Sequence, residues 1–270
     1  MHHRWNNVLL AGLLTVVASG CAVEVPKTPK PANLILISLD ALRADHLSSY
    51  GYHRRTTPFL DEIAAQGIRY SHATVNTHGT PPSHTTMLSS LYQETHRVGL
   101  GLTPGQPEAP LIPAEIELVR VPFILWGRDI PAGVVDPGLV STIDIAPTLL
   151  GIAGVSPSAV MEGRNVLGPD PTPWREQRVF AQYGTAVYSI RTPSFKLIES
   201  AGGRQMLFDL ARDPRERRNI AAEQPDLTAA LAVELEDWRL ARPNLVNLAS
   251  SNTEIDPATE EQLKVLGYLD

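Results

Sequence analysis

A continuous apolar run near the N-terminus constrains the fold more than any other feature of the sequence. It extends from Leu34 to Leu39 and ends at Asp40. An apolar run without alternation is typical of a strand that is buried on both faces, as in a parallel α/β sheet. In such folds the carboxyl ends of the strands carry the chemistry. The run therefore predicts an α/β fold with Asp40 as a candidate site residue, the alternative for Asp40 being an N-cap before Leu42.

The residues before this run have the pattern of an export signal. A short basic start precedes the apolar run Val8–Ala18, which is too short to span a bilayer and leads through small residues to Cys21. This resembles the lipobox of bacterial lipoproteins, in which the cysteine is lipidated. We expect a signal peptide over 1–20 and a proline-rich tether over 21–32, anchored at the outer membrane of a Gram-negative bacterium. The alternative is a cleaved signal with a chance cysteine.

Composition excludes some classes of function. The chain has 270 residues, 43% of them hydrophobic, and a formal net charge of -6 without a basic stripe. An acidic globular chain of this kind favours a small-molecule or carbohydrate ligand and no nucleic acid. Cys21 is the single cysteine, so the chain has no disulfide framework. We expect contact with a membrane only through the lipid anchor.

The elements after the first run alternate as in an α/β domain. Thr57 and Pro58 predict the start of a helix that Gly67 ends, and Ile68–Ala73 predicts a strand. Further elements are predicted as a helix from Pro81, a loop over 99–113, a strand over 121–126, a turn over 127–133 and a helix over 143–153.

The residue composition and pattern change after Gly168. Prolines mark a linker, and short patterned runs predict antiparallel strands at 179–181, 186–191, 195–199 and 205–210. A helix is predicted over 225–238, and one more in the tail. We therefore divide the rest of the chain into a core at 33–168, a C-terminal α+β subdomain at 169–245 and a tail at 246–270.

Three stretches with a particular order and spacing carry the strongest motif. They are 33–51, 56–67 and 80–92, and the third contains Thr80 and His84. Together they resemble the N-terminal portion of sulfatases, in the alkaline phosphatase superfamily. Later stretches agree with the same family at 120–124, 143–150, 195–198, 207–214 and 261–269. The resemblance implies an alkaline-phosphatase-like α/β fold and a hydrolase of sulfate esters.

The resemblance also implies roles for individual residues. Asp40 corresponds to a ligand of a divalent cation, although Ala41 replaces the second aspartate of many sulfatases. Thr80 occupies the position of the nucleophile and would also contact the metal. Sulfatases convert a cysteine or serine there to formylglycine, which threonine cannot form, so Thr80 resembles the nucleophile of phosphotransferases in the superfamily. The metal would be calcium, or zinc or manganese beside a threonine, and phosphate or phosphonate esters become candidate substrates.

Thr80 and His84 also have simpler interpretations. Thr80 precedes two prolines at a predicted helix start, where the helix dipole and free N–H groups favour an anion, but it could serve only as an N-cap. His84 lies one turn further on the same face and stands where the sulfatase motif has arginine. It could donate to the nucleophile or to a bound anion, or be an ordinary histidine at the edge of the core. Arg43 and Asp45 are expected to form an ion pair that fixes the loop, and Lys196 to be structural.

The middle of the family pattern is missing. A second pair of metal ligands, Asp with His or Asn, and a substrate-binding His and Lys are expected after the first motif. All 8 histidines lie at or before His96, and the one Asp-His pair is Asp45–His46. An internal deletion near 101–119, with a join at 113–118, accounts for this. Three hypotheses follow: an active ester hydrolase, a catalytically inactive lipoprotein that retains the fold, and a truncated product of a longer sulfatase.

Overall fold

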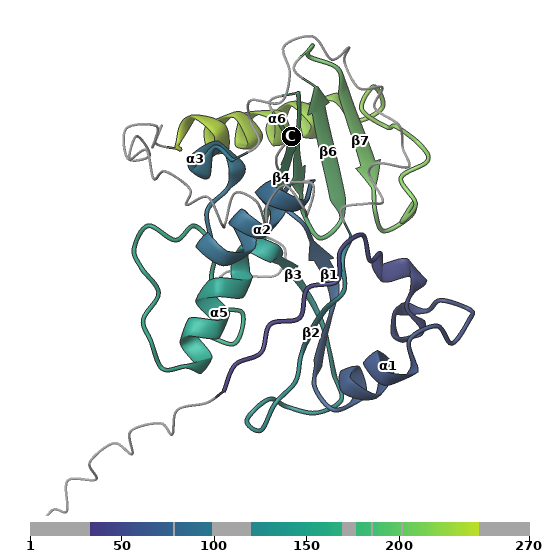
Figure 1. The fold of residues 1–270 in the computed structure, drawn as a ribbon. Coiled ribbons are helices and arrows are strands. Elements are labelled where there is room, and N and C mark those ends of the chain that lie inside the picture. The colour runs from purple at the N-terminus through teal and green to yellow at the C-terminus, as the bar shows by residue number, and fades with distance from the viewer. Residues whose placement is uncertain are drawn as a thin grey trace, which may run out of the picture.

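The computed structural model describes residues 33–77, 79–98, 120–168, 177–184, 186–200 and 202–242. Two sheets dominate it (Figure 1). One is a three-stranded sheet of order β2-β1-β3, and the other is a four-stranded sheet of order β4-β5-β6-β7. Helices flank both, so the predicted α/β class with an antiparallel C-terminal part is confirmed. The predicted signal peptide, Cys21, the join and the tail lie outside the described residues.

The first sheet is built from local signals in the sequence. After the 3-10 turns η1 (Ala44–His46) and η2 (Ser48–Tyr50), helix α1 (Pro58–Ala65) begins at a proline and is followed by β1 (Ile68–Thr74). Helix α1 and strand β1 were both predicted. Strand β2 (Phe123–Leu125) pairs with β1 in antiparallel register, Ile68 opposite Leu125. Gly67 permits this pairing, because a Cβ there would lie 2.1 Å from the Leu125 carbonyl oxygen.

Strand β3 (Val134–Ser141) was not predicted. It pairs in parallel with β1, with a shift of register between Tyr70 and His72. Asp136, Pro137 and Gly138 lie at this irregularity. Asp, Pro and Gly are typical of turns, and here they divide the apolar pattern in two. The sequence therefore did not indicate that a single bulged strand runs through them.

Helices connect this sheet to the rest of the molecule. They are α2 (Thr80–Ser89), α3 (Gln93–His96), the 3-10 turn η3 (Thr142–Asp144) and α5 (Ile145–Ile152). The predicted helices at Pro81 and at 143–153 correspond to α2 and to η3 with α5. The buried Asp144 side chain accepts hydrogen bonds from the Ser141 and Arg164 N–H groups. It thereby fixes the start of η3 and the loop that returns past it.

The C-terminal part follows the sequence prediction closely. Strands β4 (Val179–Tyr183), β5 (Val187–Arg191), β6 (Phe195–Ser200) and β7 (Gln205–Asp209) form an antiparallel meander, which α6 (Pro225–Leu240) covers. Leu231, Leu235 and Trp238 of α6 pack against Ile190 and Leu197 of the sheet. This is the largest apolar core cluster of the described residues.

The prediction of a buried strand at Leu34–Leu39 is wrong. The segment has no regular secondary structure and crosses the front of the first sheet as an open coil (Figure 1). Ile35 is 81% exposed and Ile37 71%. A strand buried on both faces needs neighbours on both sides, and no strand of the described residues pairs with this segment. The apolar pattern is thus typical of a wider sheet than the three-stranded one that the described residues form.

The exposed position of Ile35 predicts that a polar residue is tolerated there. Ile35→Ser is expected to change the free energy of unfolding by less than about 0.5 kcal/mol, because the side chain is exposed. Leu139→Ala, at a side chain 1% exposed in β3, is the control and is expected to cost roughly 2–5 kcal/mol. Urea unfolding measures both. A cost above about 2 kcal/mol for Ile35→Ser would mean that the segment is packed in a sheet after all.

Candidate functional site

A large cavity lies between the open coil, the first sheet and the C-terminal sheet. Its volume is about 1350 Å³. Most of its lining is apolar, from 34–39, α1, β2 and α5. Asp40, Thr80, His84 and Lys196 contribute polar groups to the same cavity. The predicted site residues of the described chain therefore share one cavity, although they come from distant parts of the sequence.

Asp40 and Thr80 are in direct contact. The Thr80 hydroxyl donates a hydrogen bond to Asp40 Oδ2 at 3.1 Å, and the Ala41 N–H donates to Oδ1 at 3.0 Å. Ala41 has a φ of 55°, a left-handed conformation that is unfavourable for alanine. This turn directs the Asp40 carboxylate toward the first residue of α2. A hydroxyl bonded to a carboxylate has the arrangement of a nucleophile beside its base.

The N-terminus of α2 offers fewer backbone N–H donors than the sequence predicts. Pro81 and Pro82 have no N–H group, and the Ser83 N–H donates to the Gly79 carbonyl at 3.1 Å. Of the first three helical residues, only Thr80 has an N–H. The helix dipole still favours an anion there, but the expectation of several free N–H groups is wrong.

His84 is turned toward the backbone of Thr80. Its Nδ1 lies 2.9 Å from the Thr80 carbonyl oxygen, which can only accept, so Nδ1 carries the proton. In the neutral ring Nε2 is then an acceptor, and it can donate only when the ring is protonated. No hydrogen bond joins His84 to the Thr80 hydroxyl among the described contacts. A role for His84 toward the nucleophile stays a prediction.

Asn76 fixes the loop that leads to Thr80. Its side chain is fully buried and its Oδ1 accepts from the Ser141 hydroxyl, the Thr142 hydroxyl and the Ile143 N–H. Its Nδ2 donates to the Phe180 carbonyl at 2.8 Å. One side chain therefore joins β3, η3 and β4 four residues before the candidate nucleophile. No sequence motif points to Asn76, because a lone asparagine has no periodic pattern.

Comparison with known proteins adds the family. The Sulfatase profile matches residues 32–116, and the profile of the N-sulphoglucosamine sulphohydrolase C-terminal region matches 115–241. The chain belongs to the sulfatase family. The two matches account for nearly all of the described residues, in agreement with the resemblance found from the motifs.

Relatives of this sulfatase-family chain are much longer. Mouse arylsulfatase K is 29% identical over 53% of this chain and 28% of its own length. The N-acetylglucosamine-6-O-sulfatase of Bacteroides thetaiotaomicron is 30% identical over 38% of this chain and 22% of its own length. A solved structure, of a protein in complex with its substrate D-glucosamine-2-N,6-O-disulfate, is 26% identical with a TM-score of 0.39, over 49% of this chain and 30% of that one. The chain thus spans about a quarter of the length of these curated relatives.

Sulfatases generally depend on a divalent cation, and the described residues do not fit one. Asp40 and Thr80 supply oxygen donors of the right type, but a calcium ion takes six to eight ligands. The described residues hold no group of three His, Cys, Asp or Glu side chains that could bind a metal. The Asp45–His46 pair is already engaged, since Arg43 binds both Asp45 oxygens at 2.9 and 2.7 Å. This bidentate contact lowers the pKa of Asp45 to about 2 and confirms the predicted loop-fixing pair.

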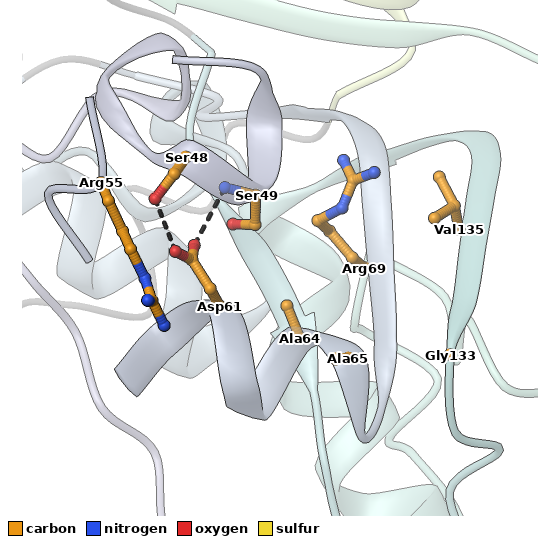
Figure 2. A pocket seen from close by; sticks show the side chains of 9 residues that line it. All are labelled: Ser48, Ser49, Arg55, Asp61, Ala64, Ala65, Arg69, Gly133 and Val135. Carbon is orange, nitrogen blue, oxygen red and sulfur yellow. Dashed lines mark hydrogen bonds between the residues drawn. The ribbon is translucent and has the colours of Figure 1, made fainter. Parts of the chain in front are cut away.

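A second, open pocket of about 580 Å³ lies at α1 and has a structural explanation (Figure 2). Its carboxylate, Asp61, accepts from the Ser48 hydroxyl at 2.5 Å and from the Ser49 N–H at 2.9 Å. The Thr57 hydroxyl contacts the same side chain at 3.3 Å. These contacts tie η2 to α1, and we therefore interpret Asp61, in the second motif stretch at 56–67, as a residue that fixes the loop before α1.

The helix that carries Thr80 is held in part by a histidine that acid should disrupt. His96 Nδ1 accepts from the Val98 N–H at 3.1 Å, so Nε2 carries the proton and donates to the Thr86 hydroxyl at 3.0 Å. Burial lowers the pKa of His96 to about 4 from its ordinary value of 6.5. Between these values the unfolded chain binds a proton that the folded chain does not. Stability is therefore lost as the pH falls from 6.5 toward 4.

We expect His96→Gln to reduce this loss, because glutamine can make both hydrogen bonds without titrating. The measurement is the urea midpoint between pH 7.5 and pH 5. The exposed His53→Gln is the control and should follow the wild type. Asp144 acts in the opposite direction, since burial raises its pKa to about 6, so the variants are compared with one another. An unchanged acid slope in His96→Gln would show that His96 does not carry the effect.

No helix in the described part of the chain is long and apolar enough to cross a membrane.

Proposed function

We propose that this chain is a hydrolase of sulfate esters, with Thr80 as the nucleophile and Asp40 as its hydrogen-bond acceptor. The observation that carries the proposal is the 3.1 Å contact between Thr80 Oγ1 and Asp40 Oδ2 in the wall of the large cavity. Two residues forty positions apart meet at the start of a helix in a chain of the sulfatase family.

The proposed chemistry uses the hydroxyl itself. The Thr80 oxygen attacks the sulfur or phosphorus of the ester and its proton passes to Asp40, while the bond from sulfur or phosphorus to the leaving oxygen breaks and the alcohol takes a proton from solvent. Water then attacks the same sulfur or phosphorus, its proton returns to the Thr80 oxygen, sulfate, phosphate or phosphonate is released, and Asp40 gives its proton to solvent. Threonine cannot become formylglycine, so phosphate and phosphonate esters are the second substrate class to test. The leaving group would be a carbohydrate or another small alcohol, and we propose that the protein is exported and anchored through Cys21.

A paired assay tests the proposal. Purified protein is given an aryl sulfate and an aryl phosphate, with calcium, manganese or zinc added or removed by chelation. Turnover of either ester that Thr80→Ala abolishes supports the proposal. Equal rates in wild type and Thr80→Ala would remove Thr80 from the mechanism.

A second candidate is a catalytically inactive member that retains the fold, or a truncated product of a longer sulfatase. It is favoured by the meeting of the two profile matches at residues 115 and 116, inside the predicted join at 113–118. The exposed apolar segment at Leu34–Leu39 also supports it, since no strand in the described part of the chain pairs with it. Metal content of the purified protein separates the two candidates: a stoichiometric divalent cation favours the enzyme. The intact mass of the native protein and long-read sequencing of its locus decide whether a longer product exists.

A further inference from the structure

A buried cluster of charged side chains lies where β1 meets the C-terminal sheet. Arg191 ends β5 and Lys196 lies opposite it on β6. Their side chains meet Arg120, which pairs with the end of β1, as well as His72 of β1 and Glu216. Arg191 is 7% exposed, and Lys196 and Glu216 are each 4% exposed. Neither the candidate nucleophile nor its carboxylate belongs to this cluster.

The charges in the cluster do not balance among the described residues. Lys196 Nζ contacts both oxygens of Glu216, at 3.0 and 3.2 Å, so this carboxylate has a cation of its own. Arg120 and Arg191 add two further positive charges. Burial and the two guanidinium groups lower the pKa of His72 to about 4. Its Nδ1 accepts from Arg191 Nη2 at 3.2 Å, which requires the neutral ring.

Two donors in this cluster also have no partner. The Nε atoms of Arg120 and Arg191 are buried and make no hydrogen bond to the described residues. A buried guanidinium with an unused N–H is costly, because it has lost water and gained no acceptor. Planar guanidinium groups bind tetrahedral oxyanions through paired N–H contacts. The cluster therefore has the charge and the donors of an anion site.

We propose that Arg120 and Arg191 bind a small tetrahedral oxyanion, sulfate or phosphate, beside the Lys196–Glu216 pair at the junction of the two sheets. Lys196 lines the large cavity, which gives the anion a route from solvent. The bound anion would neutralise the two arginines and join β1 to the C-terminal sheet. This site is separate from the proposed chemistry at Thr80 and does not depend on it.

Thermal unfolding with added anion tests the proposal. Sodium sulfate and sodium phosphate are titrated from zero to about 20 mM at constant ionic strength set with sodium chloride. We expect a saturating rise of the melting temperature with one or both anions, because a ligand that binds only the folded state stabilises it. Arg191→Gln is expected to weaken the apparent affinity at least about tenfold, since it removes charge-assisted hydrogen bonds.

Controls separate a bound ion from a general salt effect. Sulfate stabilises many proteins without saturation, so only a saturating shift of the melting temperature indicates a bound ion. Arg212→Gln removes an exposed positive charge outside the cluster and should keep the wild-type saturating shift. Thr80→Ala should keep it too, which distinguishes failure of this proposal from failure of the proposed activity. If Arg191→Gln does not fold, Arg120→Gln takes its place in the thermal titration. The NMR resonances of the arginine Nε–H groups in the wild type, followed during a sulfate titration, give a second measurement. A linear shift, or an equal shift in Arg191→Gln, would overturn the proposal.

Discussion

Replacing Thr80 by alanine is expected to lower kcat/KM for the better of the two ester substrates at least about a thousandfold. The reason is that the hydroxyl is the proposed nucleophile, and no other hydroxyl hydrogen-bonds to Asp40 among the described contacts. Asp40→Asn should lower it about a hundredfold or more, because an amide cannot accept the proton. Initial rates at saturating and limiting substrate measure both variants, with circular dichroism to verify the fold.

Thr85, five residues after Thr80, provides a matched control. Thr85 lies on the same helix, and its hydroxyl bonds only to the Pro81 carbonyl among the described contacts, at 2.9 Å. Thr85→Ala should retain at least about half of the wild-type rate. A double variant of Asp40 and Thr80 should be no slower than Thr80→Ala, since the two residues act as one unit. Activity that survives Thr80→Ala but fails in Asp40→Asn would assign the chemistry to a different nucleophile.

The elements that sequence predicted well are those whose signals are local. Helix α1 begins at Pro58 and ends before Gly67, and the meander β4–β7 has short runs with turns between them. The segment 34–39 failed for a different reason. Its apolar pattern specifies what it would pack against, but not whether those neighbours are present.

The candidate site also contains residues that local motifs identified and residues that only tertiary packing brings together. Motif spacing identified Asp40 and Thr80, and the fold brings them into contact, although their roles remain predictions. Sequence could not identify Asn76 or the Arg120–Arg191 cluster. Their importance comes from burial and from partners such as Phe180 and His72, more than a hundred residues away along the chain. Such pairings follow from tertiary packing and leave no periodic pattern.

Asn76→Ala is expected to destabilise the fold by about 3 kcal/mol or more. The variant leaves the buried Ile143 N–H and the partly buried Phe180 carbonyl without their partner, and each such loss costs about 1–3 kcal/mol. Asn76→Asp should cost a similar amount, because it keeps the acceptor oxygen but loses the donor to Phe180 and buries a charge. Urea unfolding at pH 7.5 measures both variants against the wild type.

A double-mutant cycle assigns this loss to the connection itself. Ser141→Ala removes one partner of Asn76, so the combined variant should be less destabilised than the sum of the two single variants. Asn76 also precedes the loop to Thr80 and donates to β4, so its loss should lower ester turnover even in the fraction that remains folded. If Asn76→Ala costs under about 1 kcal/mol and the cycle is additive, the two sheets are joined by other contacts and Thr80 is positioned without this asparagine.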